Sequence, residues 1–404
     1  MEQHIVIVGG GYAGLNLVSS LQKQFTGQRG MRITLLDKET FHLRKVLLFQ
    51  GAVEGTALKI PFSTYFDGTI EVIQGELSGV EQQQKRIGIK LPNGQTESLQ
   101  YDRLILCLGS RVVSAAPEQG GHSLTDTDSS EMIRVQLERN VRDAQLAARV
   151  SERQRLLSVA VVGSGITGIE TASVLACGLR RKAVAAGLDP TLISVTLIGS
   201  QARLLEAAPP HVSQRLEKEL GELGVHILHG ARAEAFRDGA VLLRDGASLP
   251  VGACVWTLGL RPNPLVQQLG LPLEGNGKLM VDERYHVKGC EHVYAIGDCA
   301  HVFDPLTGKA DGMTCKEAIP QATRLAKIIK AELAGEKGPA HEAYMNLFCI
   351  GLGPEKGFIW IQKWGMNIVL TGKLGRQVRK LTWDMASLMS RKVVEHLQVE
   401  AGRK

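Results

Sequence analysis

Two glycine-rich segments, roughly 150 residues apart in this 404-residue chain, have the residue types and spacing of phosphate-binding turns. The first, at 9–14, follows the apolar run 4–8, and the second, at 163–168, follows the apolar run 159–162. Both read Gly-x-Gly-x-x-Gly between an expected strand and an expected helix. Glycine is needed there because a side chain would hold the backbone away from a pyrophosphate, whose charge is met by amide groups and the positive helix end. The pair predicts two nucleotide sites; the alternative is a tight turn that binds nothing.

Three acids stand where such sites need carboxylates. Asp37 ends the apolar run 33–36, where a carboxylate can accept a bond from an adenosine ribose hydroxyl, or can cap a turn. Asp298 ends a second apolar run, at the sheet edge where open α/β sheets place their ligands; the alternative is a turn residue. Glu170 follows the second glycine segment and could simply be a first-turn acid favoured by the helix dipole.

The elements that must position these residues alternate between strand and helix. Residues 1–115 show this alternation, the polar stretch 116–157 predicts a connecting helix, and a second βαβ pattern runs from 158 to about 270. We expect its strands near 159–162, 194–198, 225–229, 240–243 and 253–258, further strand character at 277–282 and 293–298, and a helix at 314–334. The chain is therefore predicted to be an α/β protein with two Rossmann-like domains and a C-terminal segment.

Composition limits the classes of protein. The hydrophobic content of 44% is ordinary for a globular chain, and no apolar run approaches the ~20 residues of a membrane span. The first apolar run leads directly into a glycine turn, so we expect a strand rather than a signal peptide, and a cytoplasmic protein. The net charge of +6 is modest, and we expect no nucleic-acid partner.

The seven cysteines, at 107, 177, 254, 290, 299, 315 and 349, form neither a Cys-x-x-Cys pair nor a zinc-ligand spacing. We therefore expect neither a dithiol relay nor a metal site. Cys107 and Cys299 lie in apolar strand ends, which predicts small core residues rather than nucleophiles.

Four motifs in one order, at 9–14, 106–109, 163–170 and 295–300, resemble the two-dinucleotide-binding-domain flavoproteins of the pyridine nucleotide-disulfide oxidoreductase superfamily. The resemblance covers about residues 1–335, and the phrase at 256–264 is similar to the type II NADH dehydrogenases, which are NADH:quinone oxidoreductases. It implies a discontinuous FAD-binding domain at 1–115 and 271–335, an NAD(P)H-binding domain with a leading linker helix at 116–270, and a C-terminal region at 336–404.

The resemblance also implies which residues hold each cofactor. For FAD they are Gly9, Gly11, Tyr12, Ala13, Gly14, Asp37, Lys38, Leu77, Gly109, Asp298 and Ala318. For NADH or NADPH they are Gly163, Gly165, Ile166, Gly168, Glu170, Ser200, Arg203 and Gly259. The implied reaction passes hydride from NAD(P)H to FAD and two electrons on to a quinone. Glu170 and Lys356 are the implied catalytic residues, near the nicotinamide–flavin contact and the flavin ring; a surface lysine is the alternative for Lys356.

The chain departs from these relatives at two places. Residues 315–320 replace an Ala-Gln-x-Ala-x-Gln stretch beside the quinone channel, so two alternatives stay open: a soluble NAD(P)H reductase of ferredoxin or another small acceptor, and an NAD(P)H-sensing flavoprotein. Gly199 replaces a glutamate at a strand end, which removes a ribose acceptor and a source of repulsion toward a 2′-phosphate. Ser200 and Arg203 could contact that phosphate, so we expect weak discrimination between NADH and NADPH.

The C-terminal segment predicts where the enzyme works. Residues 371–404 carry eight Lys and Arg against three Asp and Glu. Five apolar residues recur at helical spacing, with a basic rim beside them: Leu374, Val378, Leu381, Met385 and Leu388, then Lys373, Arg376, Arg379 and Lys380. Such a helix could bind an anionic membrane surface, peripherally on the inner face of the cell membrane; the alternative is a helix packed on the protein's own flank. A homodimer is also expected.

Overall fold

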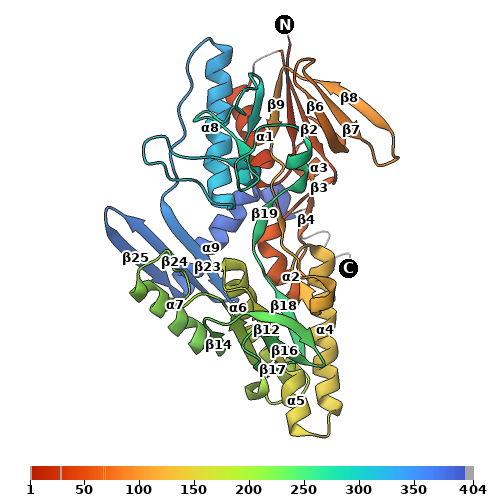
Figure 1. Cartoon of the computed structure of the whole chain (residues 1–404), viewed down its shortest axis with the longest axis vertical. Helices are drawn as coiled ribbons and strands as arrows, with labels where there is room; N and C mark the ends of the chain where they lie inside the picture. Colours follow the sequence, from red (N-terminus) through yellow and green to blue (C-terminus); the bar gives the residue numbers. More distant parts are fainter. Residues whose placement is uncertain (1, 28–29, 67, 69, 396–404) are drawn as a thin grey trace.

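The computed structural model describes residues 2–27, 30–66, 68 and 70–395. It shows two α/β domains joined end to end, with a small C-terminal sheet against their junction (Figure 1). The first domain has a five-stranded parallel sheet in the order β21-β9-β1-β2-β5. Its strands are β1 (Gln3–Val8), β2 (Met31–Asp37), β5 (Glu71–Gln74), β9 (Arg103–Leu106) and β21 (Val293–Ala295). Helices α1 (Tyr12–Gln24) and α8 (Cys315–Leu333) pack on each other, and α8 confirms the helix predicted at 314–334.

The second domain repeats this plan with a parallel sheet in the order β11-β18-β12-β13-β14. Its strands are β11 (His122–Ser123), β12 (Ser158–Val162), β13 (Ser194–Ile198), β14 (Val225–Leu228) and β18 (Ala253–Trp256). Its helices are α4 (Thr127–Leu146), α5 (Val150–Leu156), α6 (Ile166–Ala185) and α7 (Pro210–Glu222). In both domains the central strand leads through a glycine turn into a helix. The prediction of two Rossmann-like domains is therefore confirmed.

Each domain also carries a three-stranded antiparallel sheet. These are β6 (Glu76–Glu81), β7 (Arg86–Lys90) and β8 (Thr96–Gln100), then β15 (Ala233–Arg237), β16 (Ala240–Leu243) and β17 (Ser248–Pro250). The segment between β2 and β5 forms β3 (Phe41–Leu43), α2 (Leu48–Glu54), β4 (Lys59–Pro61) and α3 (Phe62–Tyr65), and β20 (Leu279–Met280) and β22 (Ala300–His301) flank β21 in sequence.

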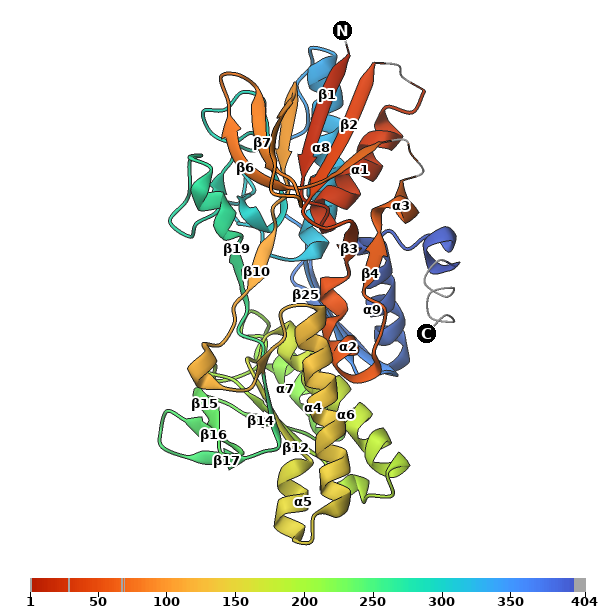
Figure 2. The same cartoon turned by 90° about the vertical axis from the view of Figure 1, so that its right-hand side faces the viewer.

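Two antiparallel strands, β10 (Ser110–Val112) and β19 (Leu260–Pro262), run between the domains (Figure 2). They continue the chain from β9 and β18 through Gly109 and Gly259, and each glycine carbonyl accepts a bond from the opposite crossing strand, at 3.1 and 2.9 Å. The carboxyl edges of both sheets therefore face this junction. Because parallel sheets bind ligands at that edge, the two glycine turns face a common region.

The domain limits in the structure differ from the predicted ones. Helix α2 packs on α4 and α6, so Phe49 and Val53 lie in the core of the second domain. Val266 and Leu269 lie in the core of the first domain, so the predicted boundary at 270 falls a few residues late. A segment that leaves one domain buries its apolar residues in the core that lies nearest in space. The order of residues in the sequence does not show which core that is.

The C-terminal region forms an antiparallel sheet of β23 (Asn346–Leu352), β24 (Lys356–Lys363) and β25 (Met366–Thr371), crossed by α9 (Gly372–Ala386). Gly375 of α9 packs directly on Gly357, because a Cβ at either glycine would lie within 2.4 Å of the other's backbone. The face of α9 turned inward carries Gly375, Arg379, Trp383 and Ala386. Residues 396–404 of the predicted basic tail lie outside the described residues.

Candidate functional site

The first glycine turn contains glycines of two kinds. Gly9 has a φ of +105°, and a side chain there would place its Cβ 2.3 Å from the Cys107 carbonyl oxygen. A Cβ at Gly14 would lie 1.9 Å from the Gly9 carbonyl oxygen, so these two glycines let strand, turn and helix pack closely. Gly11 differs, because a Cβ there meets nothing within 4 Å. Its φ of −71° and ψ of −165° suit any residue, so packing alone does not require glycine.

The second glycine turn repeats this division. Gly163 has a φ of +110° and approaches the Thr257 carbonyl, and Gly168 approaches Gly163, each too closely for a Cβ. Gly165 is exposed, with open space where its Cβ would stand. An open middle glycine at a helix N-terminus is the cradle that a pyrophosphate needs. Both turns therefore fit a dinucleotide, and a turn built only for packing does not explain Gly11 or Gly165.

Asp37 lies beside the first turn at the end of β2. Its Oδ2 accepts a bond from the Gly10 amide at 2.5 Å, and its Oδ1 accepts one from the Glu39 amide at 2.8 Å. Burial raises the pKa of Asp37. The carboxylate thus braces the glycine turn and stands at the predicted ribose position. Lys38 beside it is exposed, 4.0 Å from Glu39.

Two aromatic residues that the sequence did not single out hold this turn from behind. The His42 ring is fully buried and bonds the Gly10 carbonyl at 3.0 Å through Nδ1. Burial lowers the pKa of His42 to about 4, so the neutral ring donates Nδ1–H to that carbonyl. Phe62 lies where a side chain at Gly10 would stand, and the Tyr12 ring meets His42 edge-on at 5.0 Å.

A second cluster forms around Asp298. The Ser110 hydroxyl donates to Asp298 Oδ2 at 2.5 Å, and burial raises the pKa of Asp298. The Lys45 ammonium donates to the Ser110 carbonyl at 2.9 Å. Gly297 lies against Ala13 at the start of α1, so Asp298 and the first glycine turn are close neighbours. The sequence did not point to Ser110 or Lys45. The position of Ser110 directly after Gly109 is the one signal that could have indicated Ser110.

Two other predicted FAD-site residues are core residues. Leu77 of β6 and Ala318 of α8 are both buried in the core of the first domain. Cys107 and Cys299 are buried there too, which confirms that they are core residues. Burial raises the pKa of Cys299 to about 11, so its thiol is neutral. Within the described residues, no group of His, Cys, Asp or Glu is arranged to hold a metal ion.

Glu170 is engaged in a buried ion pair that joins α6 to α9. Arg379 donates from Nε to Glu170 Oε1 at 2.8 Å and from Nη2 to Oε2 at 3.0 Å, and the Gly351 amide also donates to Oε1 at 2.7 Å. The two side chains are only 3% and 10% exposed. Burial alone would lower the pKa of Arg379, but the Glu170 carboxylate outweighs it and the pKa is raised. This carboxylate is fixed in position, and the first-turn dipole is not its main partner.

The side chains of Lys356 and Arg203 both have protein partners, and their predicted roles stay predictions. The Lys356 ammonium pairs with Glu222 at 3.1 Å and with Glu219 at 3.5 Å, both on α7, as the surface-lysine alternative requires. The Arg203 guanidinium donates to the Ala208 carbonyl at 2.6 Å, to the Ser213 hydroxyl of α7 and to the Glu206 carbonyl of its own loop. The ion-pair and hydrogen-bond partners of long side chains cannot be predicted from the local sequence.

The remaining residues predicted for the nucleotide site lie at the junction-facing edge of the second sheet. Ile166 begins α6, Ser200 is exposed after β13, and Gly259 has a φ of +93° after β18. The Thr257 hydroxyl, which the sequence did not indicate, donates to the Val162 carbonyl at 3.0 Å and holds the end of the central strand.

Two Rossmann-like domains with open glycine turns at facing sheet edges define the class of two-dinucleotide-domain oxidoreductases. Residues 3–324 match the family model of the pyridine nucleotide-disulphide oxidoreductases, and the chain belongs to that family. It is 25% identical over 332 residues to a type II NADH:quinone oxidoreductase of Haemophilus influenzae, covering 74% of this chain and 73% of the relative. It is 24% identical over 363 residues to an NADH dehydrogenase-like protein of Bacillus subtilis, covering 88% and 91%.

The fold is similar to that of a solved NDH2 from Plasmodium falciparum in complex with NADH. The TM-score is 0.81 at 17% identity, covering 99% of this chain and 97% of that one. This likeness extends to the C-terminal sheet and α9, which lie beyond the residues matched by the family model.

Proposed function

We propose that this protein is an FAD-dependent NAD(P)H:quinone oxidoreductase. The observation that carries the proposal is the pair of glycine turns with open middle glycines, Gly11 and Gly165, at facing sheet edges. The similarity to type II NADH:quinone oxidoreductases supports NAD(P)H as donor and quinone as acceptor. When bound, the flavin would supply hydride acceptance from the nicotinamide and release of two electrons to the quinone.

The residues of this chain would bind and orient the two dinucleotides. The amides of the first turn and the N-terminus of α1 would meet the FAD pyrophosphate, with Asp37 at the ribose. Asp298, oriented by Ser110, would bond the ribityl-phosphate end. The second turn would hold NAD(P)H in the same way.

Glu170 would act as a positioning residue near the nicotinamide–flavin contact. Its two oxygens accept three hydrogen bonds from Arg379 and Gly351, so its orientation is fixed. The C-terminal helix thereby contributes to the site through Arg379, in addition to any part in docking.

Stopped-flow spectroscopy of the purified yellow protein tests the function. NADH or NADPH should bleach the flavin absorbance, and a quinone should restore it within the turnover time. Heat-released nucleotide should be FAD. Rapid reoxidation by ferredoxin but not by quinones would favour a ferredoxin reductase, and bleaching with no acceptor turnover would favour a sensor.

The apolar surface beside the C-terminal helix is suited to a membrane. Leu374, Leu381 and Met385 are 64%, 57% and 56% exposed on the outer face of α9, although the helix itself packs on the protein. On β25, alternate residues are exposed beside it: Met366, Ile368 and Leu370. These six residues form the outer apolar patch. Among the described residues, no helix is long and apolar enough to span a bilayer. We infer that the patch, with Lys373 and Lys380 around it, binds an anionic membrane surface.

The variant Leu374→Ser/Leu381→Ser/Met385→Ser should lose sedimentation with anionic liposomes while keeping its flavin, because these side chains make no core contact. The control is Leu146→Ser/Val150→Ser, which removes exposed apolar residues at the far end of the second domain. Truncation at Leu370 is unsuitable, because it removes Arg379 and the buried Trp383. Unchanged liposome binding of the triple variant would refute docking through this patch.

The nucleotide preference is set around Gly199. A Cβ at this position would lie 2.2 Å from Ser164 Oγ and 2.6 Å from Ser164 Cβ. We therefore expect Gly199→Glu alone to weaken binding of both NADH and NADPH. Gly199→Glu/Ser164→Gly should relieve the overlap and shift kcat/KM toward NADH by about tenfold, through ribose bonding and repulsion of the 2′-phosphate. Ser164→Gly alone is the control, and an unchanged ratio in the double variant would show that this strand end does not face the ribose.

A further inference from the structure

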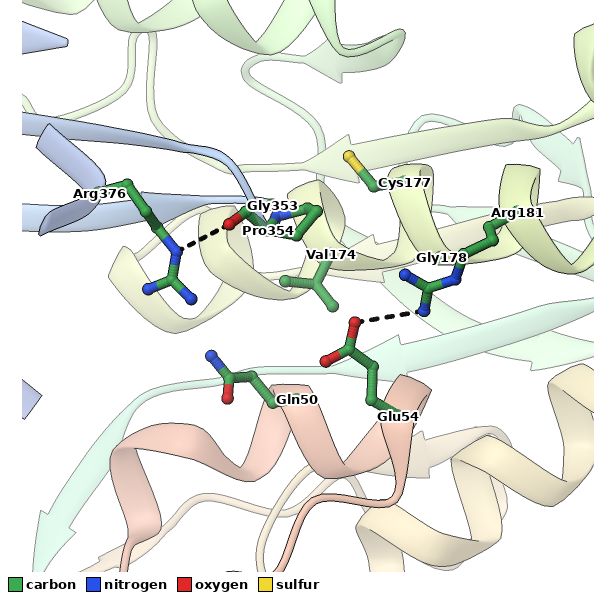
Figure 3. Close-up of a pocket in the computed structure, with 9 residues that line it drawn as sticks. All are labelled: Gln50, Glu54, Val174, Cys177, Gly178, Arg181, Gly353, Pro354 and Arg376. Atoms are coloured by element: carbon green, nitrogen blue, oxygen red, sulfur yellow. Dashed lines mark hydrogen bonds and ion pairs between the residues drawn. The ribbon is translucent and has the colours of Figure 1, made fainter. Parts of the chain in front are cut away.

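A small polar cavity lies where the two domains and the C-terminal region meet (Figure 3). Its volume is about 60 Å³. Gln50 and Glu54 of α2, Cys177 and Arg181 of α6, Pro354 of the β23–β24 turn and Arg376 of α9 line it. It is separate from both glycine turns, and the proposed reaction does not use it.

Arg376 brings an unsatisfied donor to this cavity. Its Nε donates to the Pro354 carbonyl at 3.1 Å, and its guanidinium lies 4.9 Å from the Trp383 ring centre, which fixes its orientation. Its Nη1 is buried and has no hydrogen-bond partner among the described residues. Figure 3 shows the free end of the guanidinium turned toward Gln50. A buried charged donor is costly unless an acceptor meets it.

The lining has more positive than negative charge. Arg181 donates to Glu54 at 3.3 Å, so this pair is neutral overall and Arg376 leaves one positive charge in excess. Burial raises the pKa of Cys177, so its thiol adds no negative charge at neutral pH. Burial lowers the pKa of Arg376, because the cavity wall removes its guanidinium from solvent. An anion would supply the missing acceptors.

We propose that this cavity binds a small oxyanion of the phosphate or sulfate class, held by Arg376 with the Gln50 amide and the Arg181 guanidinium. A volume of 60 Å³ corresponds to about four water positions, which suits a free oxyanion and is far too small for a nucleotide. Guanidinium groups are suited to such ligands because their planar donors match two oxygens at once.

The position of the cavity gives the anion a structural role. Cys177 lies two helical turns along α6 from Glu170 on the same face, and Arg376 lies one turn along α9 from Arg379. The anion would therefore bridge the same two helices as the Glu170–Arg379 pair, and α2 as well. Its binding should tighten the C-terminal region on both domains.

Calorimetric titration of the full-length, flavin-containing protein with inorganic phosphate tests the proposal, at ionic strength held constant with chloride. We expect saturable binding. Arg376→Gln should raise the dissociation constant about tenfold or more, because a charge-assisted donor pair is lost. Glu54→Gln should lower it, because the repelling acid is removed. Lys373→Gln, which removes one charge from an exposed position of the same helix, should leave it unchanged.

The opposite signs of the Arg376 and Glu54 variants separate an anion from a cation. Weaker phosphate binding in Glu54→Gln would overturn the proposal. So would a rise in melting temperature that does not saturate and is equal in the wild type and Arg376→Gln, since that is the general effect of phosphate exclusion from protein surfaces. If Arg376→Gln fails to keep its flavin, Arg376→Lys replaces it, because this variant retains the charge and should bind phosphate with intermediate affinity. Phosphate affinities that are unchanged in both Arg376→Lys and Glu54→Gln would also overturn the proposal.

Discussion

Gly11→Val should give a folded protein that contains no flavin. The substitution meets no protein atom within 4 Å of its Cβ, and the backbone at Gly11 is extended, so the fold has no reason to change. The branched side chain instead fills the space over the turn where the pyrophosphate would lie, so flavin binding should fall below detection. The absorbance spectrum and circular dichroism of the purified variant measure the two properties separately.

Two matched variants serve as controls for this prediction. Gly165→Val makes the same change in the second turn, so it should keep its flavin but lose bleaching by NADH and NADPH. Gly14→Ala should fail to fold, because its Cβ would lie 1.9 Å from the Gly9 carbonyl oxygen. A Gly11→Val protein that retains full flavin, or a Gly165→Val protein still bleached at the normal rate, would show that the turn concerned does not hold a dinucleotide.

Arg379→Met should destabilise the protein by about 3–5 kcal/mol, because removing one partner of a buried ion pair leaves the other charge uncompensated. Among the residues that the structure describes, Glu170 would keep only the Gly351 amide as a hydrogen-bond donor to its carboxylate. Thermal and urea unfolding of the flavin-loaded protein at neutral pH provide the measurement.

The double variant Arg379→Met/Glu170→Gln provides the main control. It removes both charges, so it should recover much of the lost stability. If no stability is recovered, Arg379 stabilises the protein through packing on Trp383. Arg139→Met breaks an exposed pair with Asp143 and should cost less than about 1 kcal/mol. If Glu170 positions the nicotinamide, both Arg379→Met and the double variant should also slow flavin reduction by NADH.

The amino-acid sequence was enough to predict the two glycine turns, the strands that lead into them and the acids at the strand ends. These features are local. Close packing of strand on helix demands glycine at Gly9 and Gly163, and the proposed dinucleotides would demand it at Gly11 and Gly165, so both requirements appear as fixed spacings within a few residues. The helix at 314–334 was predictable for the same reason, because its periodicity needs no distant partner.

The partners of the long side chains become visible in the folded chain and could not be predicted from local sequence. Glu170 and Arg379 are 209 residues apart, and no local pattern joins them. Periodicity showed that α9 has an apolar and a basic face, but the apolar one faces outward, because Arg379 meets a buried carboxylate and Gly375 permits close packing. The obstruction of Gly199 by Ser164 likewise appears only when two sheet-edge turns are brought together. Contacts between distant segments depend on the path of the whole chain, which local spacing does not specify.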